Sequence, residues 1–240
     1  MPRTLPPEIF DLIIDHLHDE PAALKACCIV SKSWVPRTRK HLFARIEFNN
    51  RESLVELWKR AFPDPSNSPA HYTRSLLFFE IPLGSNVDAD GGDWIRSFHN
   101  VERLGFCNAS QASLVPFHGL SPTVRSLSLI LSTTDVFDFI CSFPLLEDLT
   151  LVTLHPESYA DGWNAPSTSP KLTGTLYLRL HERTHSVIRR LLDLPGGVHF
   201  SKFNVKFFDG ETESMKDLVS RCSDTLEFLI IHHRPSGASP

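Results

Sequence analysis

An acidic cluster at positions 88–93 contains the residue types that bind metal ions. Asp88, Asp90 and Asp93 flank the pair Gly91-Gly92, and alternating carboxylates beside glycine are typical of loops that hold Ca²⁺. The glutamate that closes an EF-hand loop is missing at the required distance. We therefore interpret the cluster as a solvated acidic loop, and the sequence predicts neither a metal ion nor a cofactor.

Cysteine and histidine are the residues from which a nucleophilic site could be built. The chain has five cysteines and twelve histidines, and such partners need only meet in space. No C-x-x-C pair, P-loop, G-x-G-x-x-G or G-x-S-x-G motif is present. Cys107 is expected at a strand end. The other cysteines fall on apolar helical faces, where a thiol acts as a small hydrophobic group: Cys27, Cys28, Cys141 and Cys222. We therefore expect a protein that is not an enzyme.

The charge balance limits the classes of partner. The formal net charge is -4 and the isoelectric point is about 6.3, whereas proteins that bind nucleic acids or anionic membranes present a basic surface. No nucleic-acid or membrane partner is expected. A local basic stretch is interpreted as a solvated face, and it consists of Arg37, Arg39, Lys40, His41 and Arg45.

Cysteine usage and hydropathy favour a soluble protein of the cytoplasm or nucleus. An odd number of scattered cysteines is typical of reducing compartments. The N-terminus carries Pro2, Arg3 and Pro6-Pro7 where a signal peptide would have an apolar core. No apolar run approaches the ~18 residues needed to cross a bilayer.

The first helix predicted by the sequence carries a very broad apolar arc. Pro6-Pro7 and Glu8 suit a first helical turn, so a helix should start there. Its apolar residues cover an arc wide enough to contact two neighbours, and they are Ile9, Phe10, Ile13, Ile14 and Leu17, with Leu12 at the edge.

A second helix, after Pro21, is apolar almost all round and should be nearly buried. Its apolar residues are Leu24, Cys27, Cys28, Ile29, Val30 and Trp34. Val30 and Trp34 are expected to seal the helices together or onto the next domain. A third short helix is predicted at 36–43. Because a helical unit of about 40 residues cannot bury so much apolar surface alone, the following domain or a partner must cover it.

The order of these residues resembles the F-box, a short helical motif. The matching pattern is L-P-x-E-I, an apolar helix, a break, and A-L-x-x-C-x-x-V-S-x-x-W. It is carried here by Leu5, Pro6, Glu8, Ile9, Ile13, Leu17, Leu24, Cys27, Val30, Ser31 and Trp34. The sequence of this motif, together with the downstream RKHLFARIEF, is most similar to F-box proteins of mushroom-type fungi. One difference is Lys32-Ser33, where many relatives have Cys-Arg.

The resemblance implies docking onto a Skp-type adaptor protein and, through it, onto a cullin-based ubiquitin ligase. The residues implied to contact the adaptor are Leu5, Pro6, Glu8, Ile9, Ile13, Leu17 and Leu24. We expect Leu5, Pro6, Ile9 and Ile13 to face outward. The open alternative is that the three helices form an internal core and nothing more.

The rest of the chain repeats the template φ-x-x-L-x-L, in which φ is usually apolar. The matching strings are TRSLLF, VERLGF, VRSLSL, LEDLTL, TGTLYL, FSKFNV and LEFLII. Their fourth residues are Leu76, Leu104, Leu127, Leu149, Leu176, Phe203 and Leu229. The spacings between these residues are 28, 23, 22, 27, 27 and 26, in the range of leucine-rich repeats. Helical spacing of apolar residues at 136–140, 187–192 and 215–222 predicts a parallel sheet with returning helices.

This part resembles the degenerate leucine-rich-repeat domains that often follow an F-box. The usual asparagine three residues after the second leucine is replaced, for example by Ser132, Leu154 and His181, so no asparagine ladder is expected. The predicted fold class is α/β: an F-box helical module at 1–44, a leucine-rich-repeat-like solenoid at 45–233 with helices on the outer side of a parallel sheet, and a disordered tail at 234–240. The last strand, at 228–231, should leave an uncovered edge.

Residues that alternate with the buried ones on each strand should form a substrate-facing surface. Tyrosine and arginine among them are enriched at protein-binding hot spots. The candidates are Leu77, Phe79, Arg103, Asp148, Tyr177, Arg179, Lys202 and Lys206.

Three functional hypotheses result from these patterns. The leading hypothesis is the substrate-recognition subunit of a Skp-cullin-F-box ubiquitin ligase, in which the repeats bind a protein substrate that the sequence does not identify. The alternative is a leucine-rich-repeat interaction scaffold whose N-terminal helices act only as a cap. An enzyme is the third, and it requires an accessible thiol beside a histidine.

Overall fold

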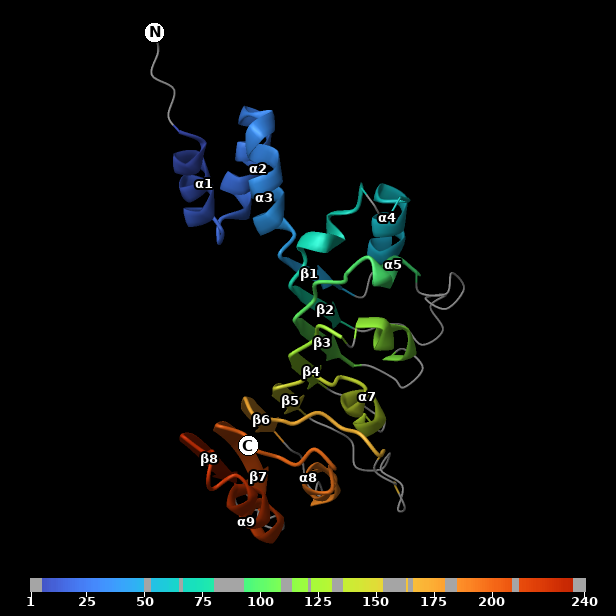
Figure 1. The fold of residues 1–240 in the computed structure, drawn as a ribbon, viewed down its shortest axis with the longest axis vertical. Coiled ribbons are helices and arrows are strands. Elements are labelled where there is room, and N and C mark those ends of the chain that lie inside the picture. Colours follow the sequence, from blue (N-terminus) through green and yellow to red (C-terminus); the bar gives the residue numbers. More distant parts are fainter. Residues whose placement is uncertain are drawn as a thin grey trace.

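A single parallel sheet organises the protein. The computed structural model describes residues 6–49, 53–64, 67–79, 93–108, 114–120, 122–130, 136–152, 163, 166–179, 185–208 and 212–234. Its sheet has eight strands in the order β1-β2-β3-β4-β5-β6-β7-β8, so each strand pairs with the next one along the chain. Figure 1 shows the strands stacked along the long axis, with α4, α5, α7 and α8 on one side of them. The α/β class and the parallel sheet are therefore confirmed.

The N-terminal helices form a compact unit at the β1 end of the sheet (Figure 1). They are α1 (Pro7–His16), α2 (Pro21–Val30), the 3-10 turn η1 (Lys32–Trp34) and α3 (Val35–Leu42). Each of the three α-helices has proline in its first turn, where the missing N–H costs no hydrogen bond. Leu42 to Arg45 then lead directly into the first strand.

Strands and helical segments alternate along most of the rest of the chain, at the positions predicted from the repeats; between β5 and β6 the described residues contain no helix. The first half contains β1 (Arg45–Phe48), α4 (Ser53–Ala61), η3 (Pro69–Tyr72), β2 (Ser75–Phe79), α5 (Asp93–Arg96), β3 (Arg103–Cys107), η5 (Val115–Leu120) and β4 (Ser126–Ile130). The second half contains α7 (Phe137–Cys141), β5 (Asp148–Val152), β6 (Thr175–Arg179), α8 (His185–Leu192), β7 (Lys202–Phe208), α9 (Thr212–Arg221) and β8 (Phe228–Arg234).

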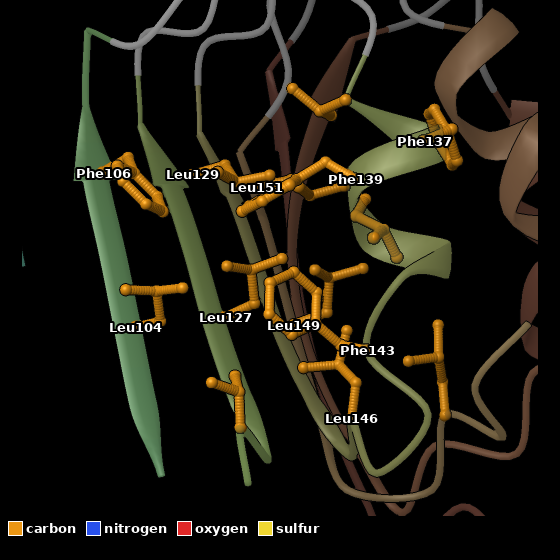
Figure 2. Close-up of a cluster of buried hydrophobic side chains, with 14 of the residues drawn as sticks. Leu104, Phe106, Leu127, Leu129, Phe137, Phe139, Phe143, Leu146, Leu149 and Leu151 are labelled. Atoms are coloured by element: carbon orange, nitrogen blue, oxygen red, sulfur yellow. The ribbon is translucent and has the colours of Figure 1, made fainter. Parts of the chain in front are cut away.

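Every second residue of the strands points into one continuous core. Leu76, Leu104, Leu127, Leu149, Leu176 and Phe203 are all buried and stand in register on neighbouring strands. A second in-register row runs from Phe78 through Phe106, Leu129, Leu151 and Leu178 to Val205. In Figure 2 the labelled residues of these rows, on β3, β4 and β5, point toward α7 and the turn after it, which carry Phe139 and Phe143. The φ-x-x-L-x-L template therefore corresponds to the core-facing pattern of each strand.

The residue before each strand repeats the same hydrogen bonds to its neighbour. The carbonyl oxygen of Arg74 accepts from the amides of Glu102 and Arg103, both at 2.9 Å. The carbonyl oxygen of Glu102 accepts in the same way from the amides of Arg125 and Ser126. The carbonyl oxygen of Arg125 accepts from the amides of Glu147 and Asp148. Threonine adds side-chain bonds between turns, as where Thr123 Oγ1 donates to the Val101 carbonyl at 2.8 Å. The positions that would hold an asparagine ladder, Ser132, Leu154 and His181, lie outside the described residues.

The C-terminal end of the sheet is uncovered among the described residues. Leu229 and Ile231 continue the two buried rows but are 42% and 48% exposed. An apolar hollow of about 390 Å³ lies between Ile231 and the α9 residues Met215 and Val219. The strand itself is longer than predicted, since β8 runs past Ile231 to Arg234, where we had placed the start of the tail. Positions 235–240 lie outside the described residues.

Replacing Leu149 with alanine tests the central role of the buried rows. Leu149 is fully buried between Leu127 and Leu176, so Leu149→Ala should lower the free energy of unfolding by about 2–5 kcal/mol. Urea unfolding followed by far-ultraviolet circular dichroism measures the loss. The control is Leu145→Ala, because Leu145 is 45% exposed and should change stability by about 0.5 kcal/mol or less. Equal shifts for the two variants would contradict the assignment.

Candidate docking surfaces

A half-buried aromatic pair and two buried aliphatic residues hold the N-terminal helices together. The rings of Phe10 and Trp34 lie 5.2 Å apart between centroids, and Ile14 and Leu24 are each 1% exposed. The buried Thr38 hydroxyl donates to the Trp34 carbonyl at 2.7 Å, which ties α3 to the turn before it. Leu24 was predicted to contact an adaptor, but in this structure its side chain is buried inside the helical unit and is not accessible at the surface.

Asp15 on α1 links this helix to α3 through polar contacts with Arg37 and His41. Arg37 Nε donates to Asp15 Oδ1 at 2.6 Å, and Arg37 Nη2 donates to Asp15 Oδ2. His41 Nε2 lies 2.7 Å from Asp15 Oδ1. The hydrogen bonds from Arg37, supported by His41, hold the pKa of Asp15 well below its ordinary value despite partial burial, and Asp15 in turn raises the pKa of Arg37. The sequence had suggested that Arg37 and His41 belong to a solvated basic face. In the structure both bind Asp15 instead.

The apolar arc of α1 is divided between the interior and solvent. Phe10, Ile14 and Leu17 are buried or half-buried, whereas Ile9, Leu12 and Ile13 are 40%, 57% and 46% exposed. These three residues, spaced i, i+3 and i+4, form one stripe of the helix surface, which we call the α1 stripe. The sequence predicted an arc wide enough for two neighbours, and the chain itself supplies only one of them in the described structure.

The end of α2 is also exposed, contrary to the prediction that this helix is nearly buried. Ile29 is 88% exposed and Val30 is 65% exposed. The expectation that Val30 seals the helices together is therefore wrong, while Trp34 does so through Phe10. We call Ile29 and Val30 the α2 end. An apolar helix without a polar face does not reveal from its sequence which side packs inward.

The remaining residues assigned to the adaptor contact are in mixed surroundings. Pro6 and Glu8 are exposed at the start of α1, and Leu17 is half-buried. Leu5 lies outside the described residues. The structure therefore leaves Pro6, Glu8, Ile9 and Ile13 accessible, and it adds Leu12, Ile29 and Val30, which the motif comparison did not select.

The second candidate surface is the face of the sheet opposite the helices, which we call the open face. All the predicted substrate-contacting residues lie on it, because they alternate with the buried residues of their strands. Arg103, Arg179 and Lys202 are exposed, and the others are half-buried. Asp148 has a structural partner, since its Oδ1 accepts a hydrogen bond from the Thr175 amide at 2.6 Å.

Two open-face residues were missed from the sequence, Ile130 and Val152. Each follows the second leucine of its repeat string and pairs in register with the other across β4 and β5. Both are half-buried. The signal that would have identified them is their position, because the residue after the second leucine always falls on the open face in this alternation.

The described residues offer no group of three or more histidine, cysteine, aspartate or glutamate side chains that could hold a metal ion. Asp88 and Asp90 lie outside these residues, and Asp93 begins α5. Cys222 is buried, its thiol donates to the Val198 carbonyl at 3.4 Å, and burial raises its pKa. Such a thiol is a poor nucleophile, because the thiolate is the reactive form. Within the part of the chain that the structure describes, no helix has the length and apolarity to cross a membrane.

Neither the models of known protein families nor the curated protein sequences give a match to this chain.

Replacing Asp15 with asparagine tests the link between α1 and α3. Asp15→Asn should reduce the protection of α1 amides from hydrogen exchange by about 1 kcal/mol at neutral pH, a value suited to a partly exposed ion pair. Because the pKa of Asp15 is lower in the folded than in the unfolded chain, its contribution is complete above the ordinary aspartate pKa of about 3.9. The difference between the two proteins should therefore shrink as the pH falls below about 4.

The matched control is Asp19→Asn, which removes the same charge from an exposed pair with His18. Its side chain is 88% exposed, so protection of α1 should hardly change. A gap for Asp15→Asn that stays constant from neutral pH down to pH 2 would contradict the role assigned to the carboxylate.

Proposed function

We propose that this protein is the substrate-recognition subunit of a Skp-cullin-F-box ubiquitin ligase. In this proposal the N-terminal helices dock onto a Skp-type adaptor, and the open face of the sheet holds the protein that is to be modified. The protein would act in the cytoplasm or nucleus, and the motif in residues 5–34 that resembles the F-box supports this assignment.

The observation that carries the proposal is the uncovered apolar surface of the helical unit. The α1 stripe and the α2 end remain exposed although the chain has a large core elsewhere. Burying one isoleucine or leucine side chain is worth about 1.5–3 kcal/mol, so a partner that covers several of them gains a substantial part of its affinity there. Exposed apolar clusters of this kind favour a protein interface.

The proposed mechanism needs no catalytic group in this chain. Holding a target lysine close to an activated ubiquitin raises the effective concentration of the reacting partners. The sheet supports such a role because its strands are linked by continuous hydrogen bonding and one core. A bound partner would then keep a defined position relative to the helical unit.

The alternative, a scaffold whose helices serve only as a cap, has an observation in its favour. The Ala44 carbonyl accepts hydrogen bonds from Arg74 at 2.8 Å and from Ser75 at 3.0 Å, and the rings of Phe43 and Trp58 meet edge to face. The end of α3 is therefore built into the first repeat. A cap explains these contacts, but it does not explain the exposed residues of α1 and α2.

Charge placed on the α1 stripe distinguishes the two functions. The double variant Ile9→Glu with Ile13→Glu should lose co-purification with a Skp-type adaptor, because two carboxylates would have to be desolvated in an apolar interface. The wild-type chain should retain the adaptor. Circular dichroism and urea unfolding should be nearly unchanged, since both side chains are already exposed.

The control for this test is Val115→Glu, because Val115 is 59% exposed on η5, away from the helical unit. It should bind the adaptor like the wild-type chain. Absence of adaptor binding by the folded wild-type chain, or full binding by the double variant, would count against the ligase function and favour the scaffold.

A further inference from the structure

One row of the open face crosses the sheet at the carboxyl ends of its strands, and its chemistry changes sharply along the way. The strand register aligns Phe79, Cys107, Ile130, Val152, Arg179, Lys206 and His232 on consecutive strands from β2 to β8. We call this the carboxyl-end row. Its β4 and β5 members are apolar, and its β6 and β7 members are cations.

The basic part of this row extends along β7, and among the described residues the open face of β6, β7 and β8 has no carboxylate beside it. Lys202 lies on the same face of the same strand as Lys206, and none of the open-face positions of β6, β7 and β8 holds aspartate or glutamate. Within the described residues Arg179, Lys202 and Lys206 form no ion pair. Arg74 and Arg125, which directly precede β2 and β4, differ because they pair with Glu102 and Glu147 at 3.1 Å and 2.5 Å.

A concentration of unpaired cations is unexpected on a chain whose net charge is -4. Like charges on adjacent strands repel one another, and this repulsion costs stability. Arg179 and Lys206 face each other in this way across β6 and β7. An anionic partner would remove the repulsion, and the apolar pair Ile130 and Val152 beside them is available for aliphatic side chains.

We propose that the carboxyl-end row binds an extended segment of a partner protein, laid across the strands, that carries aliphatic residues next to a run of aspartate and glutamate. The aliphatic side chains would cover Ile130 and Val152, and the carboxylates would meet Arg179, Lys206 and Lys202. This inference rests on the proposed function, because it specifies the kind of protein that the substrate-recognition subunit would present.

The dimensions of the surface fit such a segment. Neighbouring strands lie about 4.8 Å apart, so the distance from β4 to β7 is about 14 Å. An extended peptide advances about 3.3 Å per residue, and about five residues therefore span the apolar and basic parts. Tyr177 lies beside the row, two residues before Arg179 on β6, and offers an aromatic ring and a hydroxyl group.

The spread of the cations favours carboxylates over a single phosphate group. Lys202 and Lys206 are separated by four residues of extended strand, or about 13 Å, so a single phosphate bound between Arg179 and Lys206 would leave Lys202 without an anion, whereas several carboxylates can neutralise all three cations. Nucleic acid is disfavoured by the net charge of the chain. It is also disfavoured by the aliphatic character of Ile130 and Val152, because bases prefer aromatic side chains on which to stack.

Selection from a displayed library of random dodecapeptides by the full-length protein tests the inference. Selected peptides should be enriched in aliphatic residues adjacent to aspartate and glutamate. The tightest binder, labelled with fluorescein, should lose at least about tenfold in affinity to the variant Arg179→Glu with Lys206→Glu, and its binding should weaken with added salt. The matched control reverses two exposed arginines on the helical side, Arg189→Glu with Arg221→Glu, and should bind the peptide like the wild-type chain.

Selection without acidic enrichment, or equal binding by both double variants, would overturn the inference. A phosphoserine version of the peptide that binds more than about tenfold tighter than the glutamate version, or an oligouridylate that displaces the peptide, would also overturn it in favour of another class of ligand. Each protein is assayed in parallel for binding to a Skp-type adaptor. If the wild-type chain binds the adaptor but no acidic peptide, the inference alone is contradicted. If it binds the peptide but not the adaptor, the proposed ligase function alone is contradicted.

Discussion

The structure depends on the burial of the two apolar rows that cross the parallel sheet in register. No strand of the array can bury its core-facing residues alone, because each one is covered by the strands on either side and by the helical segment above it. Leu127, for example, stands between Leu104 and Leu149, and Figure 2 shows all three directed toward the phenylalanines of the helical layer. The register of every other residue on the sheet follows from this packing.

The same constraint determines the chemistry of the open face. With a side-chain period of two, burial of the leucine rows forces the intervening residues to the opposite side. Those residues are released from the requirement to be apolar, and β6 and β7 carry Tyr177, Arg179 and Lys206 there. The parallel register then aligns Arg179 and Lys206 with Ile130 and Val152, so that residues far apart in the sequence become a single row.

The repeats were predictable because their pattern is both periodic and two-sided. Alternation between Leu127 and Leu129 indicates a strand whichever neighbour it meets, and the spacing of the strings indicates how the strands follow one another. Once parallel pairing was assumed, the residues that stand next to one another on neighbouring strands could be predicted as well. Ile130 and Val152 were missed because, in their two strings, the open-face candidates were taken from the positions flanking the first leucine. In other strings the residue after the second apolar position was included, as with Phe79, Arg179 and Lys206.

The N-terminal helices were harder to predict, because an apolar helix can be turned either way at little cost that is visible in its sequence. Leu24 and Val30 illustrate the difficulty, since both are apolar residues of α2 and yet one is buried and the other exposed. The orientation of α1 is set by contacts between segments distant in sequence, namely Asp15 with Arg37 and His41, and Phe10 with Trp34. These contacts draw the side of α1 that carries Ile14 inward, so the α1 stripe is left facing outward.

The α1 stripe and the basic part of the carboxyl-end row lie near opposite ends of the sheet, and this separation bears on the proposed function. The helical unit joins β1, whereas the basic part of the carboxyl-end row lies on β6 and β7. At about 4.8 Å per strand, β1 and β7 are about 29 Å apart. A receptor that works by proximity needs a spacer that does not fold back, and a sheet with hydrogen bonds between every pair of strands provides one. The repeats would thus set the distance between the docked adaptor and the bound segment, as well as the chemistry of the surface.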